Sequence, residues 1–187
     1  MVAATQLKVG MTILFNNEPY RVMTMQHITP GNWRGMVQTK LRNLKNGSTV
    51  ENRFRSEDKL ERASLEQHEM EYLYNDGSDY YFMNAATFEQ TTLSAETLGD
   101  NVNYLIPNIK LMVEYYDGKP VGVEPPNVVE LKVVDTVPNM RGATLTASQK
   151  PATLETGLIV QVPPFIEIGE TIRIDTSEGK YLERAKT

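Results

Sequence analysis

Short runs of alternating apolar and polar residues, bounded by Gly, Pro or Asn, recur along this chain of 187 residues. The run at 36–44, MVQTKLRNL, divides between an apolar face and a polar face: Val37, Thr39 and Leu41 against Gln38, Lys40 and Arg42. Side chains of a strand alternate between its two faces, so this period predicts a half-buried strand. The chain is therefore predicted to be all-β, built from short strands and tight turns.

A nine-residue segment at 27–35, HITPGNWRG, lies between two of these strand-like runs. Pro fixes φ and Gly permits a positive φ, so Pro30-Gly31 predicts a turn. After it come Asn32, the only tryptophan (Trp33), and then Arg34 and Gly35. A large ring and a cation at a turn have no evident core to enter, so we predict that this tip, residues 30–35, contacts a partner. The alternative is a surface turn with an incidental tryptophan, because most loop tips carry no function.

A second hairpin follows the tip. Asn46-Gly47 predicts a two-residue type I′ turn, which would join the run at 36–44 to a return strand at 48–55. A sheet with one apolar face and one basic face suits contact with an RNA backbone. The predicted RNA contacts on this basic face are Lys40, Arg42, Arg53 and Arg55. The alternative is an ordinary solvated face, because basic residues at an edge also discourage aggregation.

Charge is distributed unevenly along the chain. Residues 1–63 hold 10 Lys and Arg against 5 Asp and Glu, a net charge of +5, whereas residues 64–126 hold 2 against 11, a net charge of -9. Residues 127–187 hold 7 against 8, a net charge of -1. A basic segment is steered onto phosphates and an acidic one is held away from them. Since Pro125-Pro126 also breaks any central strand, we predict three domains, at 1–63, 64–126 and 127–187.

The last two segments carry further strand signals. The aromatic residues of the acidic segment are predicted to pack rather than to stack on bases, because the segment lacks cations; they are Tyr72, Tyr74, Tyr80, Tyr81 and Phe82. A short helix is predicted after Ser94, its N-cap, and before Gly99. In the third segment, short strands that include 165–168 predict a small Greek-key barrel of oligonucleotide-binding (OB) type.

Several function classes are disfavoured by what the sequence lacks. There is no cysteine, the two histidines are far apart, and neither paired carboxylates nor metal-ligand spacings stand out. We therefore expect no enzyme, no metal and no cofactor. No apolar run approaches the ~18 residues that span a bilayer, and the first residues lack the plan of a signal peptide. The expected location is the cytoplasm, with no membrane partner.

The segment 150–170, KPATLETGLIVQVPPFIEIGE, resembles the signature of the bacterial elongation factor P family. Every fixed place of that pattern is met, by Lys150, Ala152, Gly157, Val160, Val162, Pro163, Ile166 and Gly169. The resemblance extends over essentially the whole chain. Other stretches similar to the family are KLRNLKNG, EYLYNDG, FMNAATFEQ, LGDNVNYL and PPNVVELKVVDT.

This resemblance implies an N-terminal SH3-like (KOW-type) barrel, two OB-fold barrels and an L shape resembling tRNA. It implies a monomeric translation factor that binds the 70S ribosome, with its 23S and 16S rRNA, between the P and E sites. Such a factor contacts peptidyl-tRNA in the P site and promotes peptide-bond formation where consecutive prolines stall the nascent chain. The alternative is a general single-stranded-RNA-binding protein or RNA chaperone built from the same barrels.

The tip departs from the family pattern. The residue after the tip glycine is commonly a modified lysine or arginine, and counting back from KLRNL places Asn32 there. Three possibilities stay open. The loop acts unmodified, with Asn32 hydrogen-bonding and Trp33 or Arg34 stacking on or pairing with RNA; or Arg34 takes the role of the usual cation; or a different modification exists, made by its own enzyme. We favour the unmodified loop.

Two other family features fall in the third segment. A Gly-Asp-Thr-Ala-like stretch that approaches the E-site codon corresponds here to Gly142–Leu145, GATL, with Ala143 in place of the Asp. This difference weakens the expectation of a codon contact. Tyr181 and Arg184 resemble family positions near the small subunit and the tRNA, which makes them candidate RNA contacts. The alternative for both is local packing and surface charge.

Overall fold

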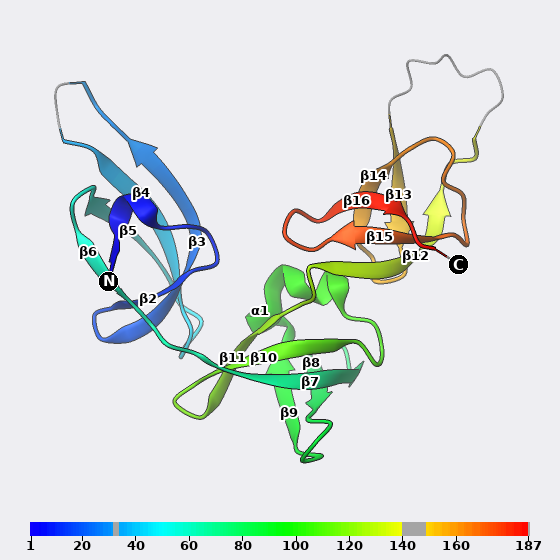
Figure 1. The fold of residues 1–187 in the computed structure, drawn as a ribbon, viewed down its shortest axis with the longest axis horizontal. Coiled ribbons are helices and arrows are strands. Elements are labelled where there is room, and N and C mark those ends of the chain that lie inside the picture. The colour runs from blue at the N-terminus through cyan, green and yellow to red at the C-terminus, as the bar shows by residue number, and fades with distance from the viewer. Residues whose placement is uncertain (32–33, 140–148, 187) are drawn as a thin grey trace. The chain divides into compact units, whose positions relative to one another are not determined.

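Three β-sheets follow one another along the chain in the computed structural model, which describes residues 1–31, 34–139 and 149–186 (Figure 1). Within these residues, helical structure is limited to short segments, of which the only α-helix is α1 (Ala95–Leu98). The all-β class predicted from the short alternating runs is therefore confirmed. The three sheets are described in turn because they position the candidate site.

The first sheet has the strand order β1-β6-β2-β3-β4-β5, and its paired strands are antiparallel. Its elements are β1 (Val2–Ala3), the 3-10 helix η1 (Ala4–Gln6), β2 (Thr12–Phe15), β3 (Glu18–Ile28), β4 (Met36–Asn43), β5 (Thr49–Arg55) and β6 (Lys59–Arg62). The predicted alternation in β4 is confirmed, because Val37, Thr39 and Leu41 are each at most 1% exposed. They face the core of this sheet, which includes Ile13 and Phe54.

The turns of the first sheet differ from the prediction. The prediction of a two-residue type I′ turn at Asn46-Gly47 is wrong. The β4–β5 loop spans residues 44–48, and only Gly47 in it has a positive φ, 74°. Buried Asn43 organises this loop: its Oδ1 accepts hydrogen bonds from the backbone N–H of Lys45 (2.8 Å) and of the next residue (3.2 Å). The two-residue turn with positive φ at both positions lies at Asn16-Asn17, between β2 and β3.

The second sheet has the order β11-β10-β7-β8-β9. Its elements are β7 (Glu66–Asn75), β8 (Asp79–Met83), β9 (Gln90–Ser94), α1, the 3-10 helix η2 (Gly99–Tyr104), β10 (Lys110–Tyr116) and β11 (Lys119–Glu124). The predicted helix is confirmed: Ser94 Oγ accepts a hydrogen bond from the Thr97 N–H at 3.1 Å, and Gly99 ends α1 with φ 57°. These two residues cap the helix as their types predict.

The aromatic residues of the second sheet divide into two groups. Tyr72 and Phe82 are buried in the core, 2% and 0% exposed, as the packing interpretation predicted. Tyr74 is 55% exposed and stacks on Tyr81, with ring centroids 4.6 Å apart. Cross-strand packing therefore holds for both groups, but the second group lies at the surface.

The third sheet has the order β14-β13-β12-β15-β16. Its strands are β12 (Val128–Thr136), β13 (Lys150–Leu154), β14 (Ile159–Val162), β15 (Thr171–Asp175) and β16 (Lys180–Arg184). The predicted strand at 165–168 is wrong. That segment turns, with the Ile166 N–H bonded to the Pro163 carbonyl at 3.2 Å, and it buries Ile166 completely in the core of this sheet. Ile166 therefore fills the core from a loop, whereas Phe165 and Ile168 are exposed.

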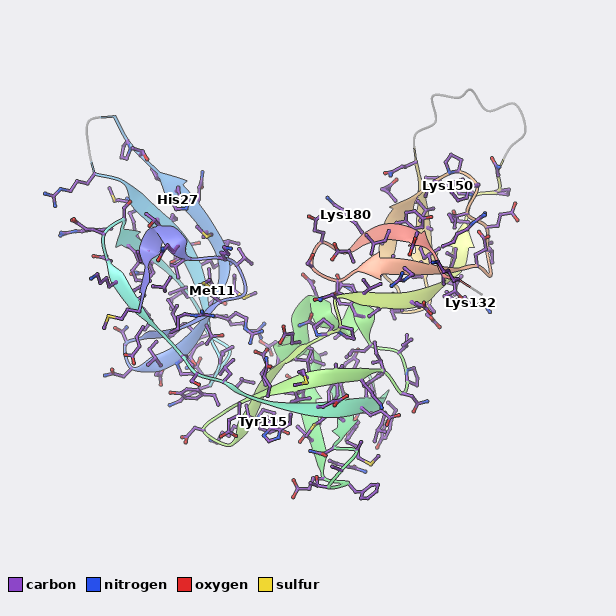
Figure 2. The ribbon with its side chains drawn as sticks, viewed as in Figure 1. Met11, His27, Tyr115, Lys132, Lys150 and Lys180 are labelled. Carbon is purple, nitrogen blue, oxygen red and sulfur yellow. The ribbon has the colours of Figure 1, made fainter. Side chains whose placement is uncertain are left out.

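Lys150, labelled in Figure 2, is the only charged residue that is buried among the described residues, with 8% exposure. Its Nζ donates a hydrogen bond to the Val137 carbonyl oxygen. A buried ammonium without such an acceptor would carry a large desolvation cost. The contact therefore joins the start of β13 to the residue that follows β12.

The chain divides into two compact units. The first comprises residues 1–67 with 114–121, and the second comprises residues 68–113 with 122–187. The end of β10 and the first half of β11 therefore belong to the first compact unit, although both strands are part of the second sheet. The boundaries predicted at residues 63 and 126 remain a prediction.

Candidate RNA-contact surface and tip loop

The two longest strands of the first sheet carry the predicted tip. β3 and β4 pair as far as Ile28 and Met36, so residues 29–35 form the connection between them. Pro30 and Gly31 are exposed, and Gly31 has the positive φ, 50°, that the prediction required. Asn32, the predicted counterpart of the commonly modified residue, and Trp33 lie outside the described residues, as do Gly142–Leu145.

Arg34 lies beside the turn that follows β5. Its Nη1 is 3.0 Å from Glu57 Oε1, and the two side chains are 83% and 65% exposed. Surface ion pairs of this kind contribute about 0–1 kcal/mol. Arg34 can therefore exchange Glu57 for another anion, such as a phosphate, at little cost.

Gly35 packs closely against the same turn. Its carbonyl oxygen accepts a hydrogen bond from the Ser56 N–H at 3.0 Å, and a Cβ at residue 35 would lie 2.6 Å from Ser56 Oγ. Real Cβ atoms essentially never lie that close to another heavy atom, so a side chain at residue 35 would displace the Ser56 hydroxyl. Two neighbouring residues of the β5–β6 turn, Ser56 and Glu57, thus contact the base of the tip.

Replacing Gly35 with alanine is expected to destabilise the first sheet by roughly 1–3 kcal/mol, because an extra methyl group must fit into an occupied space. The double variant Gly35→Ala, Ser56→Ala should recover most of the loss, since it removes the Oγ that the new Cβ meets. Urea unfolding checks both variants. Equal stability of Gly35→Ala and the parent chain, or no recovery in the double variant, would contradict this account of the tip base.

The four cations predicted on the first sheet share one face of β4 and β5. The register places these cross-strand pairs on the face opposite the core: Met36 with Arg55, Gln38 with Arg53, Lys40 with Glu51, and Arg42 with Thr49. Because residue 36 lies at the tip end of β4, this basic face runs from Arg42 to Arg55 beside the tip. The structure therefore brings together the residues that the sequence assigned to one face.

Two contacts hold cations of the first sheet in place. Arg53 Nε donates to Gln38 Oε1 at 3.0 Å, across the β4–β5 pair. Arg21, which faces Arg42 from β3, binds Glu114 instead, with Nη2 2.9 Å from Oε1. These side chains are only 20% and 12% exposed, so Arg21 serves the packing of the first unit rather than the open basic face.

The sequence did not predict the carboxylates that pair with Arg21 and Arg34. Glu114 is separated from Arg21 by 93 positions, and Glu57 from Arg34 by 23. Neither pair has the fixed spacing of a helix or a hairpin. Only the tertiary structure shows that Arg21 and Arg34 have anionic partners.

Tyr181 and Arg184 lie on β16, in the second compact unit. Tyr181 packs against the core of the third sheet, and burial raises the pKa of its phenol. The Arg184 guanidinium lies 4.5 Å from the Phe165 ring centroid and pairs with Glu170 Oε1 at 3.2 Å. These contacts agree with the alternative of local packing, although the Arg184 side chain is still 51% exposed. Their role in RNA contact remains a prediction.

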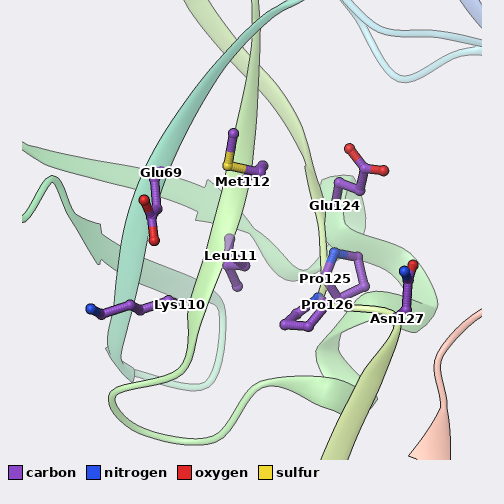
Figure 3. Close-up of a pocket in the computed structure, with 8 residues that line it drawn as sticks. All are labelled: Glu69, Lys110, Leu111, Met112, Glu124, Pro125, Pro126 and Asn127. Carbon is purple, nitrogen blue, oxygen red and sulfur yellow. The ribbon is translucent and has the colours of Figure 1, made fainter.

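A hollow of 300 Å³ lies on the second unit, shown in Figure 3. Its polar side chains are Glu69, Lys110, Glu124 and Asn127, so its lining contains neither a histidine nor a hydroxyl or thiol nucleophile. Across residues 1–31, 34–139 and 149–186, no three His, Asp or Glu side chains are grouped so that they could hold a metal ion. In the same ranges, no helix has the length and apolar character that crossing a bilayer would require.

Comparison with known proteins gives matches along the chain. Residues 3–60 match the family described as "Elongation factor P (EF-P) KOW-like domain", residues 65–123 match "Elongation factor P (EF-P) OB domain", and residues 129–184 match "Elongation factor P, C-terminal". These matches cover the three sheets and agree with the multi-barrel architecture predicted for them.

Curated relatives match almost end to end. The protein described as "Elongation factor P" from Acidobacterium capsulatum is 54% identical over 184 residues, which cover 98% of this chain and 99% of the relative. Proteins with the same description from Gemmatimonas aurantiaca and Pelotomaculum thermopropionicum are 47% and 45% identical, each over 98% of this chain and over 98% and 100% of the relative. The resemblance predicted from the segment 150–170 is confirmed.

Proposed function

The chain belongs to the elongation factor P family and is a translation elongation factor, and we propose that it binds the ribosome between the P and E sites. There it contacts peptidyl-tRNA and stimulates peptide-bond formation at consecutive prolines. Proline's locked φ and its secondary amine make it a poor reactant. Holding the acceptor end of the tRNA in attack geometry lowers the entropic part of the barrier, which requires no nucleophile from the factor.

The observation that carries this proposal is the basic face of β4 and β5, which leads from Arg42 to the tip. Contacts from such a face to phosphates position a protein on RNA without reading its sequence. Lys40, Arg53 and Arg55 are exposed on this face. Glu51, paired with Lys40, is the one carboxylate among the β4–β5 cross-strand pairs of the face. The face supports a role in which cations hold the first sheet on RNA while the tip extends beyond them.

We further propose that the tip acts unmodified. Asn32 supplies hydrogen bonds there, while Trp33 or Arg34 stacks on or pairs with RNA. The exposure of the Arg34–Glu57 pair supports this, because Arg34 loses little when it exchanges partners. The mass of a peptide containing residues 30–35, taken from the native protein, tests the proposal. Any added mass on this peptide would contradict it.

Replacing Lys40 or Arg53 with alanine is expected to weaken ribosome binding modestly and to lower the slope of log affinity against log salt by about 1 for each phosphate that the protein no longer neutralises. Lys59→Ala is the matched control, because Lys59 is an exposed cation on β6, outside this face. Binding to 70S ribosomes over a series of salt concentrations measures all three. Equal slopes in the parent chain and in both face variants would contradict a phosphate-binding role for this face.

A reconstituted translation reaction tests the proposed function. Two messages are compared, one that encodes Pro-Pro-Pro and one that encodes a control sequence without consecutive prolines. The chain should raise the yield from the first and leave the second unchanged. Equal yields with and without the chain would overturn the proposal, and binding to free RNA but not to 70S ribosomes would favour a general RNA-binding protein.

A further inference from the structure

Phe88, in the second compact unit, has a backbone conformation that its residue type disfavours. Its φ is 60°, in the left-handed region, where a bulky residue is an outlier. The other non-glycine residues with a positive φ in the described part of the chain are all Asn or Asp, which tolerate it: Asn16, Asn17, Asn108 and Asp117. Phe88 is the one member of this set whose side chain does not favour its conformation.

The loop between β8 and β9 imposes this conformation. The Phe88 N–H donates to the Asn84 carbonyl at 2.8 Å, and the Asn84 N–H donates to the Glu89 carbonyl at 2.9 Å. The Asn84 Oδ1 atom also accepts hydrogen bonds from the backbone N–H of Ala86 (2.9 Å) and of Thr87 (3.2 Å). A hairpin loop with a left-handed residue favours Gly or Asn at that position, so the preferences of turns do not explain a phenylalanine there.

Packing within the chain does not explain Phe88 either. The residue is 72% exposed, the largest exposure among the aromatic residues that the structure describes. A strained conformation that the fold does not need leads to a hypothesis of function. Aromatic side chains are enriched at the centres of protein interfaces. A large apolar ring held out on a fixed loop is therefore suited to enter a pocket on a partner.

The charge around the loop favours a protein partner over RNA. Glu89 follows Phe88 directly, and the same loop lines a hollow of 310 Å³ whose charged residues are Glu69, Glu71 and Lys110. Three carboxylates thus stand against one ammonium. An RNA backbone brought up to the ring would meet a net negative charge. A protein surface with lysine or arginine around an apolar pocket would meet the opposite charge.

We propose that Phe88 anchors the second sheet on a basic protein of the ribosome, by entering an apolar pocket rimmed by lysine or arginine. The carboxylates beside the loop then face the cations of the rim. Because the hydrogen bonds of Asn84 already hold the loop, little conformational entropy is lost on binding. This inference rests on the proposed ribosome binding and adds to it a contact outside the basic face of the first sheet.

The affinity of the full chain for 70S ribosomes tests the proposal. Phe88→Asn removes the ring and keeps a residue that tolerates a positive φ, and it should weaken binding by about 5-fold or more. Phe88→Tyr keeps an aromatic ring and should bind nearly as tightly as the parent chain. Ile159→Ala is the matched control, because Ile159 is an apolar residue that is 62% exposed on the regular strand β14. It should bind like the parent chain.

Urea unfolding separates an anchor from a residue that the fold requires. Phe88→Asn should unfold at a urea concentration no lower than that of the parent chain, because Asn adopts the left-handed conformation with less strain. A phenylalanine needed for folding would instead lower the midpoint when it is replaced. Loss of binding without loss of stability is the expected combination.

A photocrosslinking analogue determines the class of partner. With p-benzoylphenylalanine at residue 88, irradiation in the presence of purified 70S ribosomes should join the chain to a ribosomal protein. The same analogue at residue 159 is the control and should not give this product.

Three results would overturn the proposal: unchanged ribosome affinity of Phe88→Asn, a lower urea midpoint that accompanies its loss of binding, or a crosslink from residue 88 to RNA alone. The parent chain distinguishes these from a failure of the proposed function. If the parent binds 70S ribosomes and Phe88→Asn binds equally well, only the anchor is wrong. If the parent does not bind, the proposed function fails and the anchor fails with it.

Discussion

Replacing Arg34 with alanine is expected to lower the stimulation of peptide-bond formation at a Pro-Pro-Pro stall by about 10-fold, because a misplaced tip loses the ordering that the factor supplies. Arg34 is the cation nearest in sequence to Asn32, which the resemblance predicts to be the counterpart of the family's tip cation. Its pairing with Glu57 is exposed and readily exchanged for RNA. Single-turnover rates of peptide-bond formation on a stalled ribosome measure the effect.

Glu57→Gln is the matched control for this variant, because it breaks the same ion pair and keeps the cation. It should retain the stimulation, or increase it slightly, since Arg34 then has no carboxylate to leave. Trp33→Ala should also lower the rate if the ring stacks on RNA. If the Arg34 and Trp33 variants both preserve the full stimulation, the proposed role of the tip is wrong.

The alternation of side chains along strands and the residue types found in turns predicted most of the fold. The elements that were predicted wrongly or missed have local causes. The strand β6 was not predicted, because Leu60 is its only buried residue and its neighbours are charged. The segment 165–168 reads as a strand because it is apolar, yet its two exposed residues, Phe165 and Ile168, flank the buried Ile166 in a turn. An apolar run alone does not distinguish a strand from a loop that fills a core.

The type I′ turn at Asn46-Gly47 failed for a different reason. Asn-Gly favours that turn, but buried Asn43 three positions earlier bonds two backbone N–H groups of the loop and donates from Nδ2 to Glu18 Oε2 at 2.6 Å. A satisfied buried amide outweighs the preference of an exposed dipeptide, because leaving Asn43 unpaired would cost more. Such competition depends on burial, which the local sequence does not specify.

The part of the candidate site on β4 and β5 was predictable, because side chains alternate between the two faces of a strand. Lys40, Arg42, Arg53 and Arg55 lie on one face because alternation and hairpin pairing require it. Tyr181 was less predictable, since its packing against the third sheet depends on contacts with distant strands. Carboxylates that pair with arginines across the fold could not be assigned either, because ion pairs follow no sequence spacing outside regular elements.

Replacing Glu114 with alanine is expected to destabilise the first compact unit by about 3 kcal/mol, the lower end for a broken buried ion pair. The Arg21 guanidinium would lose its anion while it stays 20% exposed, and its Nε is already buried with no hydrogen-bond partner in the structure. Arg42 lies directly across from it on β4, so like charges would then face one another. Hydrogen exchange of the β2 and β3 amides measures the change.

Glu57→Ala provides the comparison, because it removes the carboxylate of an ion pair whose side chains are 83% and 65% exposed. That loss should stay below about 1 kcal/mol. The double variant Arg21→Met, Glu114→Leu should be more stable than Glu114→Ala, since two apolar side chains leave no charge to desolvate. If Glu114→Ala costs no more than Glu57→Ala, burial does not strengthen the Arg21–Glu114 pair, and the packing of residues 114–121 on the first sheet must depend on other contacts.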